Sequence, residues 1–110
     1  QSLLNVLLTT SNLIKRQEFA HAYQSLSNVQ KYLLWLIRIE TYQTKHWESP
    51  TKSLENDIDP DWYSLFQQTT SELDPTDIKT AFKKTLTLTE KLFDNLGVEA
   101  KLKGVLRRIE

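Results

Sequence analysis

The sequence predicts an all-α protein, an antiparallel bundle of four main helices plus a short helix, with one long central helix. Its 110 residues include only 2 Gly and 3 Pro, too few turn-forming residues for a β fold. Apolar residues recur at the i, i+3, i+4, i+7 spacing of amphipathic helices, and no segment alternates as a strand does. We therefore expect residues 1–110 to form a single helical domain.

The central helix is expected over residues 17–47, a stretch that contains neither Pro nor Gly. From Leu33 to Ile37 five apolar residues follow one another and cover most of the helix circumference. A helix that is apolar on all sides must be buried on all sides or must meet a partner. Its core-facing stripe consists of Phe19, Ala22, Tyr23, Leu26, Val29, Leu33, Leu36 and Ile37. Its second face, expected to be exposed or covered by a partner, consists of Tyr32, Trp35, Ile39 and Tyr42.

A first helix is expected over residues 2–16, with Ser2 as its N-cap. The polar segment Arg16–Glu18 allows either a bend or a continuous run into the central helix. The last helix is expected over residues 98–109, and Gly97 is expected to end the helix before it.

Proline residues mark the breaks in the second half of the chain. Pro50 excludes Ser49 from helical geometry and predicts a loop after Trp47, with one helical turn expected over residues 53–56. Asp59-Pro60 predicts a short helix that ends near Glu72, and Asp74-Pro75 predicts a long helix that ends at Leu96.

Composition excludes several classes of protein. The 14 basic and 14 acidic residues balance, which favours neither a nucleic acid nor a membrane as partner. Without Cys, and with two His far apart, neither disulfides nor a metal site is expected. No membrane span or signal peptide is recognisable, so we expect a cytoplasmic protein. The absence of Met, including at position 1, suggests a fragment of a longer protein.

Two short motifs invite a catalytic interpretation. Asp57-Ile58-Asp59 has the D-x-D spacing of magnesium ligands. No Gly-Ser phosphate loop precedes it and Pro60 follows it, so capping and loop roles are expected instead.

Arg16 and His21 have the R-x4-H spacing of helical ribonucleases of the HEPN type. On a continuous helix they would point about 140° apart, so a structural or surface role is expected for His21.

Polar residues near the end of the central helix leave alternatives open. Arg38 and His46 would share one side of the helix, either in a polar pocket or, as we expect, at a solvated helix end. Glu40 continues the apolar stripe and would need a partner. We expect it to pair with a cation from another helix, and a functional carboxylate is the alternative.

Several motifs in a fixed order resemble a known family. The most specific is His46-Trp47 followed by Pro50-Thr51 and Leu54-Glu55. The others are the segments 16–23 and 33–38, then Trp62-Tyr63, Leu73-Asp74-Pro75 and Leu92-Phe93. This order resembles the C-terminal helical domain of antibiotic nucleotidyltransferases of the lincosamide and aminoglycoside type, a domain similar to the HEPN bundle.

The resemblance implies a function for a larger protein. An N-terminal catalytic domain, absent from this chain, would hold Mg and NTP and transfer a nucleoside monophosphate to a hydroxyl of a small-molecule acceptor. The helical domain would orient that acceptor and often forms a homodimer interface. Residues expected to line the acceptor cleft are Trp35, Tyr42, His46 and Trp47, and the candidates for a general base are Glu40 and Glu55.

Two alternatives remain. The chain would be a stand-alone HEPN-like module, either a ribonuclease toxin or the interaction partner of a separate nucleotidyltransferase. In that case Arg16 and His21, or Arg38 and His46, must meet across a dimer axis. Otherwise it would be a purely structural dimerisation domain.

Overall fold

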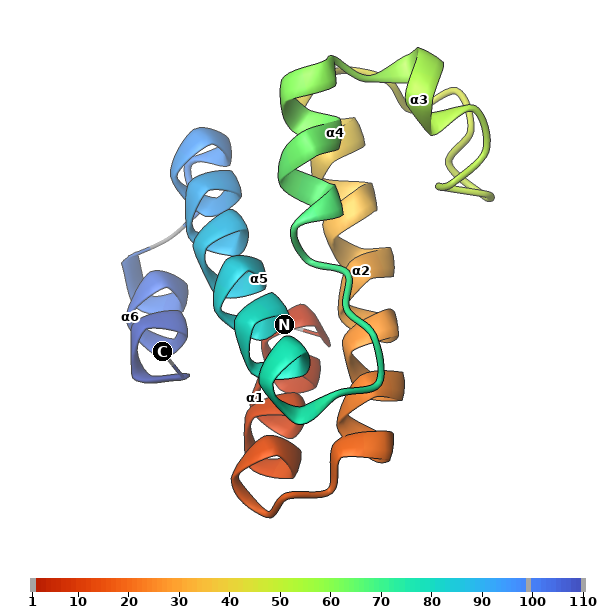
Figure 1. Cartoon of the computed structure of the whole chain (residues 1–110). Helices are drawn as coiled ribbons and strands as arrows, with labels where there is room; N and C mark the ends of the chain where they lie inside the picture. The colour runs from red at the N-terminus through yellow and green to blue at the C-terminus, as the bar shows by residue number, and fades with distance from the viewer. Residues whose placement is uncertain (1, 99, 110) are drawn as a thin grey trace.

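The computed structural model describes residues 2–98 and 100–109 and is helical throughout its regular parts (Figure 1). The elements are α1 (Ser2–Lys15), α2 (Phe19–Glu40), α3 (Leu54–Asp57), α4 (Pro60–Gln67), α5 (Pro75–Leu96) and α6 (Ala100–Ile109). The predicted all-α bundle around a long central helix is confirmed. None of these helices is both long enough and apolar enough to cross a membrane.

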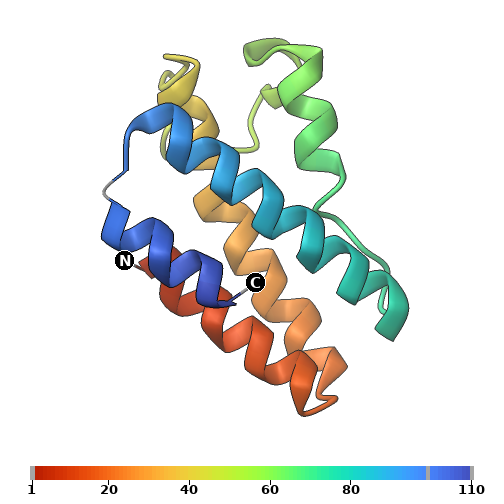
Figure 2. The ribbon, with the colours of Figure 1, turned by 90° about the vertical axis from the view of Figure 1, so that its left-hand side faces the viewer.

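Helix α2 lies at the centre of the bundle and packs against α1, α4 and α5, while α6 lies alongside α1 and α5 (Figures 1 and 2). Consecutive helices α1, α2, α4, α5 and α6 alternate in direction (Figure 1). Burial of the apolar stripes between them drives this arrangement. The main core includes Leu7, Leu26, Val29, Leu33, Leu34, Ile37, Leu54, Leu86, Leu92 and Leu106.

The central helix is shorter than predicted because α1 and α2 both end in left-handed residues. Gln17 has φ 63° and Tyr42 has φ 58°. Tyr42 N–H donates to Ile39 O and Gln43 N–H donates to Arg38 O, which is the paired bonding of a Schellman helix end. The expected continuation to residue 47 was wrong, since Tyr carries no sequence signal for this backbone conformation.

Helix ends in the second half follow the proline signals more closely. α5 has the predicted bounds, with Asp74 accepting from Asp77 N–H at 2.9 Å and Gly97 at φ 69°. α4 begins at Pro60 as predicted but ends at Gln67 rather than near residue 72, and α6 begins at Ala100 rather than at residue 98. The side chain of Ser2, expected to cap α1, lies outside the described residues.

Candidate functional site

Two tryptophan side chains form a stacked pair where α2 meets the segment 41–53, here called the 41–53 loop. The indole N–H of Trp35, on α2, donates to the carbonyl oxygen of Trp47 at 2.9 Å. The two rings stack with centroids 5.7 Å apart and planes 24° apart. Tyr32 meets the ring of Trp35 edge-on at 5.8 Å. Together the three rings form a continuous aromatic wall at the surface of the bundle.

This wall borders a pocket of about 460 Å³, here called the aromatic pocket. Helices α1, α2, α5 and α6 and the 41–53 loop all contribute to it, and every lining side chain is apolar or aromatic. The lining residues are Leu3, Tyr32, Trp35, Leu36, Ile39, Trp47, Phe93, Val98 and Leu102. A concave apolar surface of this size is typical of small-molecule sites.

Arg38 holds the 41–53 loop against the end of α2. Its guanidinium is fully buried. It donates to the carbonyl oxygens of Gln43, Pro50 and Lys52 and to the carboxylate of Asp57, at 2.7–3.0 Å. These five bonds engage all three guanidinium nitrogens, and so offset the cost of burying the charge. The solvated helix end expected for Arg38 was wrong, because the loop folds back over this side chain.

Asp57 connects this guanidinium to His46. Its Oδ2 atom lies 2.7 Å from His46 Nδ1 and 3.0 Å from Arg38 Nη1. The hydrogen bond with His46 and then the one from Arg38 lower the pKa of Asp57 below its ordinary value of 3.8. An ionised carboxylate can only accept, so His46 must carry its proton on Nδ1 when it is neutral.

His46 also lines a second concavity of about 440 Å³, here called the polar hollow. The residues that line it come from one stretch of the 41–53 loop: Lys45, His46, Trp47, Glu48, Ser49 and Lys52. Trp47 lines both the aromatic pocket and the polar hollow. Trp47 is therefore common to the two concavities.

A family model matches residues 1–109, and its description is lincosamide nucleotidyltransferase-like, C-terminal domain. The chain belongs to this family. The resemblance found in the motifs is thereby confirmed. A comparison with curated proteins finds no match. In this chain, the motif that begins at His46-Trp47 covers the second part of the 41–53 loop and continues into α3.

The structure brings three of the four predicted cleft residues together. Trp35 and Trp47 line the aromatic pocket, and His46 and Trp47 line the polar hollow. Tyr42 lines neither concavity, and its side chain is 91% exposed. The left-handed backbone at Tyr42 accompanies this outward position.

The two predicted carboxylates do not lie in either concavity. Glu40 is half-buried at the end of α2, and no described cation forms an ion pair with it, contrary to the expected pairing. Glu55 is exposed and accepts a 3.3 Å hydrogen bond from the Tyr63 hydroxyl. The charge of Glu55 raises the pKa of Tyr63 above its ordinary value of 10.0.

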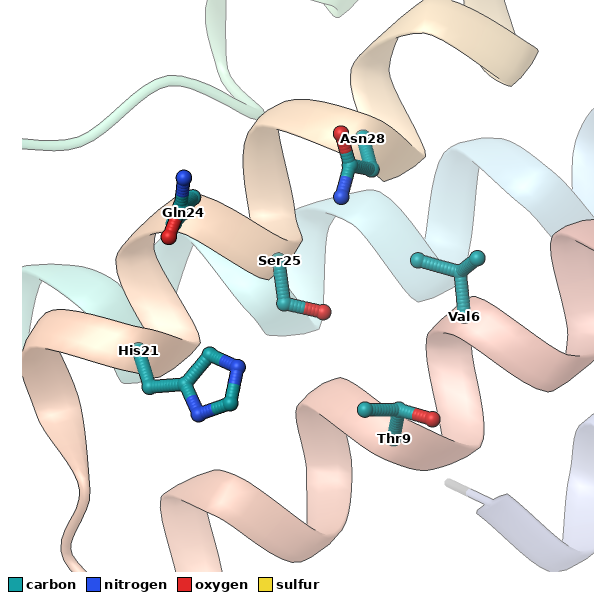
Figure 3. Close-up of a pocket in the computed structure, with 6 residues that line it drawn as sticks. All are labelled: Val6, Thr9, His21, Gln24, Ser25 and Asn28. Carbon is teal, nitrogen blue, oxygen red and sulfur yellow. The ribbon is translucent and has the colours of Figure 1, made fainter.

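The two residues of the ribonuclease-type motif, Arg16 and His21, lie in different surroundings. Arg16 lies between α1 and α2 and pairs with Glu18 at 2.7 Å. His21 lies on α2 and lines a small pocket of about 190 Å³ with Val6, Thr9, Gln24, Ser25 and Asn28 (Figure 3). Arg16 is not among its lining residues. Within this protomer, the arginine and the histidine do not share one pocket.

Two features of the site escaped sequence reasoning. Asp57 was expected to serve only as a loop residue of a D-x-D segment, yet it is the acceptor for both Arg38 and His46. One signal in the sequence indicates that Arg38 is buried: it directly follows Ile37, the last residue of the stretch that is apolar on all sides. Within residues 2–98 and 100–109, no three His, Cys, Asp or Glu side chains gather as metal ligands do.

Proposed function

We propose that this chain is the acceptor-binding domain of a nucleotidyltransferase that transfers a nucleoside monophosphate from an NTP to a hydroxyl of a small molecule. Family membership supports the link to nucleotidyl transfer. The aromatic pocket is the observation that carries the acceptor-binding role. The family description, which names a C-terminal domain, supports the proposal that magnesium and the NTP bind in a separate N-terminal catalytic domain. The metal would neutralise charge on the triphosphate there.

The chemistry of the pocket favours one kind of acceptor. Its lining includes four aromatic side chains and no Asp or Glu. A polycationic aminoglycoside would require carboxylates to balance its charge, whereas an acceptor with a ring and an alkyl group can stack on Trp35 and Trp47. We therefore propose an acceptor of the lincosamide type, with its apolar part in the aromatic pocket.

We further propose that the exposed face beside the pocket contacts another protein surface. Ile39 is 43% exposed and Tyr42 is 91% exposed, while neighbouring Tyr32 and Trp35 are only partly covered. Apolar side chains left exposed together often mark an interface. Either a second copy of the protein or the catalytic domain would cover this face.

Titration of the chain with a lincosamide and with an aminoglycoside tests acceptor binding. Quenching of tryptophan fluorescence should saturate with the lincosamide only. Trp47→Ala should weaken binding by at least about 10-fold, since it removes one stacked ring from the pocket. Trp62→Phe is the matched control, because Trp62 lies on α4 beneath Lys91, outside the pocket. Binding of neither compound by the wild-type chain, or equal binding by Trp47→Ala, would contradict the proposal.

A further inference from the structure

We propose that His46 is the catalytic base of this transfer, with Asp57 and Arg38 as positioning residues. The inference rests on the function proposed above. It assigns to a histidine the role that the sequence suggested for Glu40 or Glu55. The carboxylates of both glutamates lie outside the two concavities, whereas His46 lines the polar hollow.

The hydrogen bond to Asp57 selects the reactive nitrogen. Asp57 Oδ2 accepts from His46 Nδ1–H at 2.7 Å, which leaves a lone pair on Nε2 of the neutral imidazole. A general base needs such a lone pair within reach of the proton that it removes. Once Nε2 has taken a proton, the Asp57 carboxylate stabilises the imidazolium cation.

Arg38 makes this pair rigid. It is fully buried and anchors Asp57 through a 3.0 Å ion pair. It also anchors the loop that carries His46 through the carbonyl oxygens of Gln43, Pro50 and Lys52. A base held on both sides loses little freedom when the substrate binds, and such positioning contributes to the rate.

The surroundings of His46 suit phosphoryl chemistry. The polar hollow is also lined by Lys45, Lys52 and Glu48, a balance of two cations against one anion. Positive groups at this position stabilise charge that develops on the transferred phosphoryl group. Trp47 lines both the aromatic pocket and the polar hollow, and His46 lines the polar hollow, so the proposal places the hydroxyl of an acceptor stacked on Trp47 at His46.

Nucleotidyl transfer exchanges one phosphorus–oxygen bond for another. The acceptor oxygen forms a bond to the α-phosphorus of the NTP, and the bond from that phosphorus to the oxygen bridging to the β-phosphorus breaks. Pyrophosphate leaves with the electron pair of the broken bond. The hydroxyl proton moves to His46 Nε2 and is released to solvent after the product departs.

The test uses the full-length protein that carries this domain together with its catalytic domain. The central variant is His46→Asn, whose side-chain amide can donate to Asp57 as Nδ1–H does but has no group equivalent to Nε2. Single-turnover transfer to a lincosamide should slow by about 10²-fold or more, while acceptor affinity changes little. His21→Asn is the matched control, because His21 lies in a separate pocket (Figure 3).

A second measurement examines Asp57 without relying on the rate alone. In wild type, the imidazole carbon and nitrogen NMR shifts of neutral His46 should report a proton on Nδ1. In Asp57→Asn the new amide can donate to Nδ1, so the proton should move to Nε2 and transfer should slow by about 10-fold or more. If Asp57 contributed only to folding, its replacement by Asn would not move the proton of His46 from Nδ1 to Nε2.

The outcomes separate the two proposals. Transfer by wild type with a large loss in His46→Asn supports the inference. Transfer by wild type with an undiminished rate in folded His46→Asn overturns the inference and leaves the proposed function standing. Failure of wild type to transfer to any lincosamide or aminoglycoside overturns the proposed function and the inference with it.

Discussion

Arg38 Nη1 donates to Asp57 Oδ2 at 3.0 Å across a sequence separation of 19 residues. This contact joins the end of α2 to α3 and encloses the 41–53 loop between them. The guanidinium is fully buried, and its remaining donors are taken by backbone carbonyls of that loop. The geometry of the candidate site therefore depends on a residue that lies beneath it.

Arg38→Lys should destabilise the domain by about 2–3 kcal/mol in urea unfolding. A lysine ammonium has three donors and no planar fork, so it leaves loop carbonyls unsatisfied. Limited proteolysis should then cut within the 41–53 loop first. Arg107→Lys is the control, because the Arg107 side chain is 70% exposed and its 3.9 Å contact with Glu90 is weak. A change below about 0.5 kcal/mol for Arg38→Lys would contradict the anchoring role.

Acid should weaken the interactions of the Asp57 carboxylate that stabilise the 41–53 loop. The pKa of folded Asp57 lies below 3.8, so its contribution to stability is complete above that value and is lost as the pH falls through the lowered pKa. The stability difference between wild type and Asp57→Asn should be present above pH 3.8 and shrink as the pH falls further below that value. Urea unfolding over a pH series measures this difference, and a gap that persisted undiminished at the acid end of the series would contradict the lowered pKa of Asp57.

Trp35→Phe should loosen Trp47 while leaving most of the core intact. Phe keeps an aromatic ring on α2 but cannot donate to the Trp47 carbonyl, so about 1 kcal/mol of hydrogen bonding is lost. Acrylamide should then quench Trp47 fluorescence more strongly, with emission shifted to longer wavelength. The comparison is Trp35→Phe/Trp62→Phe against Trp62→Phe alone. Unchanged quenching would show that stacking alone holds Trp47.

Glycine should stabilise the C-terminal ends of α1 and α2, where Gln17 and Tyr42 now adopt a left-handed backbone. Gln17→Gly and Tyr42→Gly place glycine at φ values of 63° and 58°, where it avoids the strain of an L side chain. Each should raise the unfolding free energy by about 0.5–1 kcal/mol. Gly97→Ala should lower it by a similar amount, since Gly97 has φ 69° and no neighbour within 4 Å that a methyl group would meet. A fall in melting temperature for Gln17→Gly would refute this account.

Gln24→Gly is the matched control for the glycine series. Gln24 is exposed in the middle of α2, so glycine there should cost about 1 kcal/mol through lost helix propensity. Opposite signs at Gln17 and Gln24 would isolate the effect of the left-handed backbone from any general effect of glycine.

The outcome at individual residues shows which signals in the sequence were reliable. Asp74-Pro75 and Gly97 bound α5 as predicted, because a cap, a fixed proline φ and a glycine at positive φ all act locally. The end of α2 was predicted wrongly, because no sequence signal marks Tyr42 as left-handed. This conformation is stabilised by backbone hydrogen bonds to the carbonyl oxygens of Ile39 and Arg38. Trp35 and Trp47 were predicted to line an acceptor cleft, yet nothing in the sequence revealed that they stack on each other.

By itself the sequence determined the helical class, most of the buried apolar positions and the family, because helical periodicity, prolines and ordered motifs can be read along one chain. In the stripe predicted for the central helix, Tyr23 is instead 40% exposed. Only the tertiary structure decided where α2 ends and which residues form the site. Arg38, His46 and Asp57 lie far apart in the sequence and meet only when the 41–53 loop folds back onto α2. Contacts of this kind depend on the path of the whole loop, and no local propensity specifies that path.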